Sequence, residues 1–163
     1  MSLRSVGIGA VAGFGLALGL QALPMAQVSA QGVPAISGIW LDDESKGGVE
    51  IKPCGEQLCG NIIWLKQPND PNGKPWVDQL NSDTSKRTRP VCGLQIIGGL
   101  KKGASDAEWK GGWIYDPEEG KQFDVELTLK DPNTLSVFGY AGVKLLGETL
   151  VWKRMPNDTP RCK

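Results

Sequence analysis

The sequence predicts a small all-β protein, a closed antiparallel β-barrel of about eight strands with one long proline-rich loop. Three observations lead to this prediction. Residues 122–130 alternate between apolar and polar side chains, which is the period of a half-buried strand. Turn sequences flank that strand at residues 116–120 and 131–134. Similar short segments recur along the chain, none of them requires a long helix, and closure removes the unpaired edges of such a meander.

The expected strands follow one another in chain order, with turn residues between them. They cover residues 36–41, 49–52, 58–65, 94–100, 113–115, 122–130, 134–140 and 147–153. Residues 58–65 carry apolar side chains on both faces, which is typical of a strand that is covered on both sides. Residues 101–108 are expected to form a polar turn, and Asp116 should accept hydrogen bonds from backbone amides of its own turn.

Residues 66–89, here called the proline-rich loop, interrupt this pattern. They contain three prolines and no sustained periodicity, although Asp83 or Ser82 could cap one short helical turn. The segment is longer than an ordinary connection between strands, and long ordered loops are often binding loops or lids. The alternative is a plug that covers one end of the barrel.

The first 30 residues are interpreted as a signal peptide. Arg4 supplies the positive charge, residues 6–20 are apolar, and Val28-Ser29-Ala30 fits the small-residue cleavage rule. A membrane span is less favoured because the apolar run is only about 15 residues, whereas a span requires about 20. We therefore expect residues 31–163 to form a single exported domain that is periplasmic or secreted, without an integral membrane span.

All four cysteines lie in the exported part, and an even number in an oxidising compartment favours disulfides. Three pairings are possible. Because Cys54 and Cys59 bracket a plausible hairpin loop, a local bridge between them would leave Cys92 to pair with Cys162. Zinc is the weaker interpretation, since the chain has no histidine and the spacing is not that of a zinc site. We predict neither a metal nor a cofactor.

The charge and composition argue against several classes of function. The exported part is nearly neutral, so it offers no field for nucleic acid or for an anionic membrane. The lack of histidine removes Ser-His-Asp and Cys-His catalysis, and no pair of carboxylates stands out. Asp70, Asp78 and Asp83 do not match a calcium loop and are expected to be solvated. We therefore assign no catalytic residue and do not favour an enzyme.

The candidate binding residues lie in and beside the proline-rich loop, and they are Trp76, Asp78, Arg87 and Arg89. Two roles remain open for Arg89. It could fix the loop through an ion pair with Asp78 or Asp83, or it could point into the barrel mouth and receive a carboxylate or phosphate. Trp76 could cover the mouth or pin the loop down. Three further tryptophans, Trp40, Trp113 and Trp152, lie within predicted strands and are expected in the core.

Gly38-Ile39-Trp40 resembles the first strand of lipocalin-type and avidin-type barrels. In those families a basic residue after the last strand packs across the tryptophan and closes the base of the barrel. The resemblance implies that Trp40 and Arg154 form this barrel-closing pair, with the guanidinium on the indole face.

A wider resemblance covers nearly the whole exported part. The order of segments is similar to that of a bacterial exported family catalogued as domain of unknown function 2147. The matching pieces are Gly38-Ile39-Trp40, Cys54, Leu58-Cys59-Gly60, Ile63-Trp64-Leu65, Asp78, Asn81, Asp83, Arg89-Pro90, Gly93-Leu94, residues 111–117, Gly147, Thr149, Trp152 and Arg154. This resemblance implies a small exported lipocalin-like barrel without an established activity.

Three functional hypotheses follow. The first is a module that binds a small amphipathic or hydrophobic ligand in the bacterial envelope through the barrel mouth, Trp76 and Arg89, which predicts an open cavity of roughly a few hundred Å³. The second is an envelope protein–protein interaction module with a filled barrel and an exposed apolar patch around Trp76. The third and least favoured is a carboxylate-based hydrolase, which requires paired carboxylates with raised pKa values.

Overall fold

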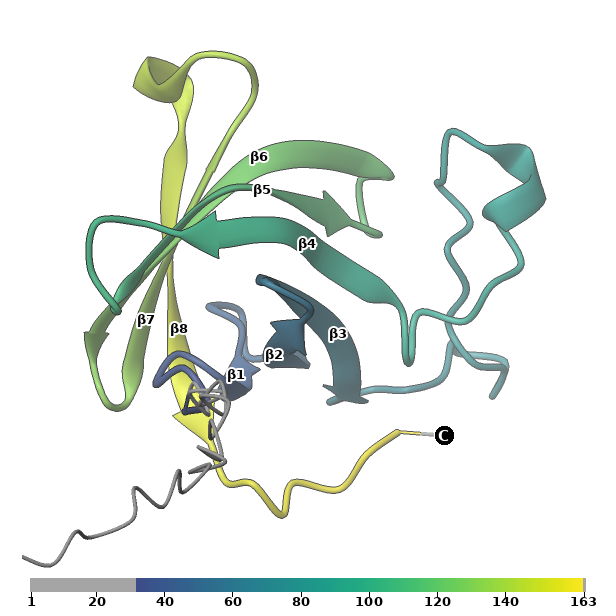
Figure 1. Cartoon of the computed structure of the whole chain (residues 1–163). Helices are drawn as coiled ribbons and strands as arrows, with labels where there is room; N and C mark the ends of the chain where they lie inside the picture. Colours follow the sequence, from purple (N-terminus) through teal and green to yellow (C-terminus); the bar gives the residue numbers. More distant parts are fainter. Residues whose placement is uncertain (1–31, 163) are drawn as a thin grey trace, which may run out of the picture. The chain divides into compact units, whose positions relative to one another are not determined.

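A computed structural model describes residues 32–162 of the chain, and the predicted signal peptide lies outside the described residues. The described part contains eight strands and two short 3-10 turns (Figure 1). The strands are β1 (Gly38–Leu41), β2 (Gly47–Cys54), β3 (Gln57–Leu65), β4 (Gln95–Lys102), β5 (Glu108–Asp116), β6 (Lys121–Asp131), β7 (Thr134–Tyr140) and β8 (Glu148–Met155). The 3-10 turns are η1 (Thr84–Lys86) and η2 (Lys144–Leu146). Within residues 32–162, no helix is long and apolar enough to span a membrane.

The predicted closed barrel is confirmed. Each strand pairs antiparallel with the next in the chain, and β1 pairs with β8 to close the sheet. In such a meander, successive connections alternate between the two ends. The β1–β2, β3–β4, β5–β6 and β7–β8 connections therefore share one end, which we call the mouth. The other connections and the start of β1 form the base.

The positions of the eight strands follow the prediction, but several differ in length: β1 is shorter than expected, β2 and β5 are longer, and the largest difference is at β4 and β5. Residues 101–108 were expected to form a turn, but β4 continues to Lys102 and β5 already begins at Glu108. The reason is the ladder between the two strands, in which Lys101 pairs with Lys110 and Lys102 with Trp109. Charged side chains that point into water do not prevent backbone pairing, so composition alone underestimates these strands.

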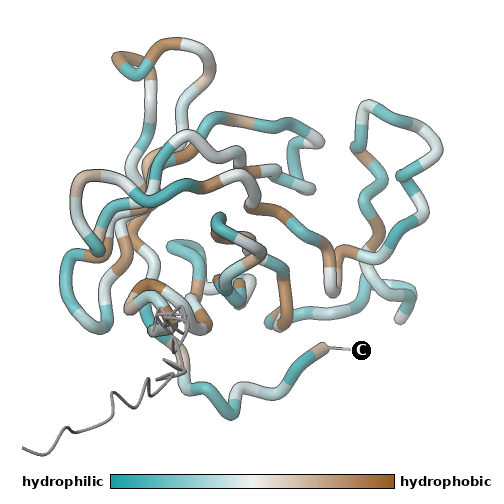
Figure 2. Tube along the Cα trace, viewed as in Figure 1, coloured by the Kyte–Doolittle hydropathy of each residue, from teal (hydrophilic) through white to brown (hydrophobic). Residues whose placement is uncertain are grey.

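Apolar side chains fill the interior of the barrel. Figure 2 shows the hydrophobic residues recurring along the strands. The largest side chains that are almost completely buried are Trp40, Ile36, Ile51, Leu58, Ile97, Leu100, Leu127, Leu135, Val125 and Val137. Val125 and Leu127 are the central apolar residues of the alternating segment, and Trp40 and Trp152 are in the core as expected. The interior of the barrel is therefore a packed hydrophobic core of side chains, which differs from an open ligand-binding cavity.

Arg154 lies across Trp40 at the base. Its guanidinium carbon is 4.1 Å from the centre of the indole ring, and its nitrogens donate to the carbonyls of Ser37, Ala35 and Pro132. Gly38 has a φ of 137°, and a Cβ at this position would collide with the guanidinium. The glycine of Gly-x-Trp therefore leaves room for the arginine beside the tryptophan.

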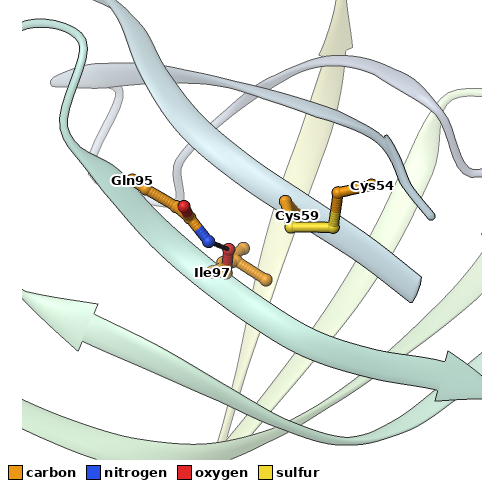
Figure 3. The surroundings of a disulfide bond; sticks show 4 residues. All are labelled: Cys54, Cys59, Gln95 and Ile97. Carbon is orange, nitrogen blue, oxygen red and sulfur yellow. Dashed lines mark hydrogen bonds between the residues drawn. A yellow bond between two sulfur atoms is a disulfide. The ribbon is translucent and has the colours of Figure 1, made fainter. Parts of the chain in front are cut away.

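Both expected disulfides are present, and together they account for all four cysteines. Cys54 and Cys59 close the β2–β3 turn, as Figure 3 shows, with Cα atoms 5.8 Å apart. Cys92 and Cys162 join the start of β4 to the C-terminal tail over a sequence separation of 70. The tail also bonds to β3, because the amide of Cys162 donates to the carbonyl of Ile63 over 2.7 Å. This explains the apolar outer face of β3, which the tail helps to cover.

Candidate binding site at the barrel mouth

The proline-rich loop forms an ordered structure. Two isolated β-bridges, Asn69 with Pro75 and Val77 with Pro90, fold it back on itself. Asp83 caps the short η1 turn as expected, because its carboxylate accepts from the amide of Ser85 at 3.0 Å. The hydrogen bond from the Ser85 hydroxyl at 2.7 Å, that from Lys86 and that from the Ser85 amide lower the pKa of Asp83 to about 2, so its carboxylate is ionised at neutral pH.

A buried carboxylate anchors this loop to the barrel. Asp78 has 0% of its surface exposed and accepts three side-chain hydrogen bonds. The donors are the hydroxyl of Tyr115 at 2.5 Å, the Nε of Arg89 at 2.8 Å and the amide nitrogen of Asn81 at 2.8 Å. The expectation that Asp78 is a solvated loop carboxylate is therefore wrong. Its charge is compensated inside the protein, which is the condition under which a carboxylate can be buried.

Tyr115 and Asn81 link the carboxylate to the barrel wall and to the rest of the loop. The side-chain nitrogen of Asn81 also donates to the Tyr115 hydroxyl over 2.9 Å, and the Asn81 oxygen accepts from the amide of Asp83. Burial and the hydrogen bond to Asp78 raise the pKa of Tyr115. The phenol therefore stays protonated at neutral pH and keeps donating to Asp78.

A pocket of about 320 Å³ opens beside this network. It lies between the loop and the strands β4, β5 and β6, and it is lined by Asn81, Ser82, Asp83, Lys86, Arg89, Gln95, Trp113, Tyr115, Gly120 and Gln122. The lining combines two cations, one carboxylate, three side-chain amides and two aromatic rings. Such a mixture suits a small ligand that has both a polar group and a flat apolar part.

Of the two cations that line the pocket, Arg89 is the one whose side chain is held by a buried carboxylate. Its Nε is bonded to the buried Asp78, and its side chain remains 38% exposed. Its guanidinium carbon lies 5.7 Å from the centre of the Tyr115 ring. Within residues 32–162 its two terminal nitrogens have no hydrogen-bond partner, whereas Lys86 is paired with Asp83 at 3.0 Å. Of the two roles considered from the sequence, the structure shows the ion pair with Asp78 that fixes the loop; Arg89 also lines the pocket, and its role as a receptor for a carboxylate or phosphate stays a prediction.

The other candidate residues are placed around the pocket, outside its lining. Asp78 lies beneath it, and Arg87 donates from its Nε to the backbone carbonyl of Asn81 at 2.8 Å. Trp76 is 36% exposed, and its backbone bonds to Pro68 and Val91 within and beside the loop. Trp113 was expected in the core, but it is only partly buried and lines the pocket. The reason is the register: Trp113 lies opposite Asp124, on the polar outer face of β6, so its ring lies on the outside of the barrel against Gly98.

Sequence reasoning missed Tyr115 and Asn81 as members of the site. Tyr115 has no distinguishing signal in a β-strand, since aromatic residues are common there. Asn81 lies three residues after Asp78, and this spacing is part of the segment order that suggested the family. The hydrogen bond between these two side chains, however, depends on the shape of the loop. In the described residues 32–162, no cluster of three carboxylate or cysteine side chains could hold a metal ion.

A family model described as "Uncharacterized protein conserved in bacteria (DUF2147)" matches residues 38–154, which contain all eight strands except for the last residue of β8. The chain belongs to this family. Its fold is also that of a solved structure, the protein HP1028 from Helicobacter pylori, which is described as belonging to the lipocalin family. The two share 24% sequence identity with a TM-score of 0.63, over 75% of this chain and 84% of the other. No curated protein matches the sequence significantly.

In this DUF2147 protein, Gly120 joins the β5–β6 turn to the proline-rich loop. Its φ is 67°, and a Cβ here would collide with the backbone carbonyl of Leu80. We expect Gly120→Ala to lower the free energy of unfolding by about 2–3 kcal/mol, because a left-handed conformation and a backbone clash add together. Urea denaturation measures the change. Gly139→Ala is the matched control, since no atom lies within 4 Å of its Cβ position; an equal loss in both variants would contradict this account.

Proposed function

We propose that this DUF2147 protein binds a small amphipathic molecule in the bacterial envelope, with the mouth pocket as its site. The observation that carries the proposal is the geometry of Arg89. A buried carboxylate holds its Nε, while its terminal nitrogens remain without partners at a pocket of about 320 Å³. A guanidinium fixed in this way can bind a carboxylate or phosphate through two parallel hydrogen bonds with little loss of side-chain entropy.

The ligand's apolar part would lie on Trp113, because the interior of the barrel is filled. This differs from a cup-shaped site, in which a ligand enters the barrel itself. The pocket is at the small end of the range of about 300–1,000 Å³ for small-molecule sites. A compact molecule with one acidic group and a flat or short apolar part fits these properties better than a long chain.

In this proposal the four residues singled out in the sequence have distinct roles. Arg89 contacts the acidic group of the ligand, and Asp78 positions Arg89. Arg87 holds the backbone of Asn81, which lines the pocket. Trp76 shapes the outer rim of the loop. The two disulfides indicate an oxidising environment, which supports the envelope location.

The first test is a binding experiment on the purified, disulfide-bonded protein. Its organic extract is examined by mass spectrometry for a co-purifying molecule. Tryptophan fluorescence is then titrated with a panel of fatty acids, isoprenoid acids and aromatic carboxylates. We expect saturable quenching that is lost in Trp113→Phe, because this indole lines the pocket. A clean extract and flat titrations with the whole panel would contradict the proposal.

Arg89 provides the second test. We expect Arg89→Gln to weaken binding of a carboxylate ligand by roughly 10- to 100-fold, because a charge-assisted hydrogen bond contributes about 1.5–3 kcal/mol. Arg89→Lys keeps the charge beside Asp78 but lacks the planar fork, so it should bind with intermediate affinity. Lys101→Gln removes an exposed cation near the base end of β4 and serves as the control. Circular dichroism establishes that each variant is folded, and unchanged affinity in a folded Arg89→Gln would refute the assignment.

A further inference from the structure

Polar side chains dominate the lining of the mouth pocket. Besides the cations Lys86 and Arg89, the lining contains three side-chain amides, one serine and one carboxylate. The rings of Trp113 and Tyr115 are its only large apolar surfaces. Small-molecule sites usually have the opposite composition, with a mostly hydrophobic wall and a few polar groups. The lining therefore favours a ligand that makes several hydrogen bonds.

The charges around this pocket compensate one another. Arg89 is paired with Asp78 at 2.8 Å, where the carboxylate is buried. Lys86 is paired with Asp83 at 3.0 Å. With two cations and two carboxylates, the pocket has no excess charge that would attract an anion from a distance. A ligand is therefore selected by the geometry of its hydrogen bonds, and Arg89 binds at most one acidic group through its terminal nitrogens.

Two glutamines in the lining keep unused hydrogen-bonding capacity within residues 32–162. Gln122 is exposed on β6, and its side-chain amide has no partner among these residues. Gln95 donates from its Nε2 to the carbonyl of Ile97 over 3.1 Å, as Figure 3 shows, which fixes the amide and leaves its Oε1 free to accept. A purely apolar ligand would remove water from these groups without replacing its hydrogen bonds, and this weakens binding.

Trp113 provides a flat aromatic surface beside these amides. Its indole lies along the backbone of Gly98 and Gly99 in β4. A Cβ on Gly98 would be 2.6 Å from the six-membered ring, and one on Gly99 would be 3.6 Å from Cδ1 of the five-membered ring. The Nε2 of Gln95 is 3.0 Å from the same Cβ position of Gly98. The glycines therefore allow the indole to lie on the sheet with an amide next to it.

An aromatic face beside hydrogen-bonding side chains suits a sugar ring. A pyranose has C–H groups on its faces, which pack on the electron-rich face of an indole. Its hydroxyls lie around the rim of the ring, and each can donate and accept a hydrogen bond. One ligand of this kind can contact the tryptophan and still satisfy the amides at the side.

We propose that the flat part of the ligand is a saccharide ring, so that the mouth pocket binds a sugar acid. The ring lies on Trp113, and its hydroxyls bond to the side-chain amides of Gln95 and Gln122. This inference rests on the proposed function for the acidic group, which Arg89 binds, and it adds the chemical class of the remainder. A pocket of about 320 Å³ is small for a ligand site, which suits a single ring.

Calorimetric titration of the disulfide-bonded protein tests this inference with two acids. D-Glucuronate carries ring hydroxyls, whereas cyclohexanecarboxylate has a six-membered ring and the same acidic group but no hydroxyl. We expect glucuronate to bind more tightly by roughly tenfold or more, because a site with hydrogen-bonding groups rejects an analogue that leaves them unpaired. D-Glucose lacks the acidic group that Arg89 binds, so it should bind more weakly than glucuronate.

The variant Gln122→Leu separates the hydroxyls from the acidic group. It should weaken glucuronate binding by roughly tenfold and leave the affinity for cyclohexanecarboxylate unchanged, since only the sugar has hydroxyls to bond. Gln57→Leu is the matched control, because Gln57 begins β3 at the base of the barrel, outside the lining. It should bind glucuronate as the unchanged protein does.

Nuclear magnetic resonance gives a second readout. The ring protons of glucuronate should move upfield on binding, because they lie over the indole. This shift should vanish in Trp113→Leu, which keeps an apolar side chain without the aromatic ring. Circular dichroism establishes that the variants are folded. Bound glucuronate without an upfield shift in the unchanged protein would refute the position of the ring.

The outcomes separate this inference from the proposed function. If cyclohexanecarboxylate binds as tightly as glucuronate, the saccharide is refuted and the proposed function stands. If neither acid binds, both are refuted. If glucose binds as tightly as glucuronate, the sugar acid is refuted together with the role proposed for Arg89. An equal loss of glucuronate affinity in Gln57→Leu and Gln122→Leu would also overturn the inference.

Discussion

Replacing both Cys92 and Cys162 with serine should lower the free energy of unfolding by about 4 kcal/mol, the largest effect that we expect from this structure. The bridge closes a loop with a sequence separation of 70. In the chain-entropy model, the loss of such a cross-link frees many conformations of the unfolded chain. The C-terminal tail should also leave β3 in this variant, because the disulfide holds the amide of Cys162 beside the carbonyl of Ile63.

The Cys54–Cys59 bridge provides the internal comparison, since its sequence separation is only 5. The same model gives about 2 kcal/mol for its removal, because loop entropy grows with the logarithm of length. Urea denaturation of the two double serine variants therefore measures the difference directly. Equal losses, or a larger loss at the short bridge, would show that loop length does not govern these two disulfides.

The second large effect is expected at Asp78. Asp78→Ala should lower the free energy of unfolding by about 3 kcal/mol, because three donors lose their common acceptor. These donors are Tyr115, Asn81 and Arg89, of which the first two are buried. Arg89 is 38% exposed and can recover some hydration, so we place the loss at the low end of the range for a broken buried ion pair.

The control for Asp78 is Asp106→Ala, which removes an exposed carboxylate paired with Lys102. A surface ion pair contributes about 0–1 kcal/mol, so the difference between the two variants isolates the effect of burial. Limited proteolysis offers a second measurement. The proline-rich loop should be cut faster in Asp78→Ala than in the control, because Asp78 joins it to the barrel wall. A variant that is as stable and as resistant as the control would refute the anchoring role.

Much of the fold could be predicted from the sequence by itself. Alternation in residues 122–130, together with turn residues between the segments, indicated where the strands lie, although not every strand end. These signals are local, because side-chain direction in a strand depends only on the position along the chain. The Cys54–Cys59 bridge was also expected from local spacing, since these cysteines bracket one tight turn, but three pairings remained possible until the structure showed Cys92 bonded to Cys162.

The candidate site could be predicted only in part. Arg89, Asp78 and Asp83 were recognisable as charged residues of an unusually long loop, but their partners were not. Whether Asp78 is solvated or buried depends on the hydroxyl of Tyr115, which is 37 residues away in the sequence. No local pattern around Asp78 or Tyr115 predicts that these two side chains come into contact. The partner is brought to Asp78 by the closure of the barrel and by the close contact between Gly120 and Leu80.

The tertiary structure also decided what the tryptophans do. Trp40, Trp113 and Trp152 all lie within predicted strands, yet two are in the core, whereas Trp113 lies opposite Asp124 on the outer face and lines the pocket. The sequence by itself determined the approximate positions of the strands, because alternation and turn residues are short-range patterns; closure and the Cys54–Cys59 bridge were expectations that the structure confirms. Only the tertiary structure decided which polar groups meet and which apolar side chains stay exposed, because these depend on the loops that the barrel brings together at its mouth.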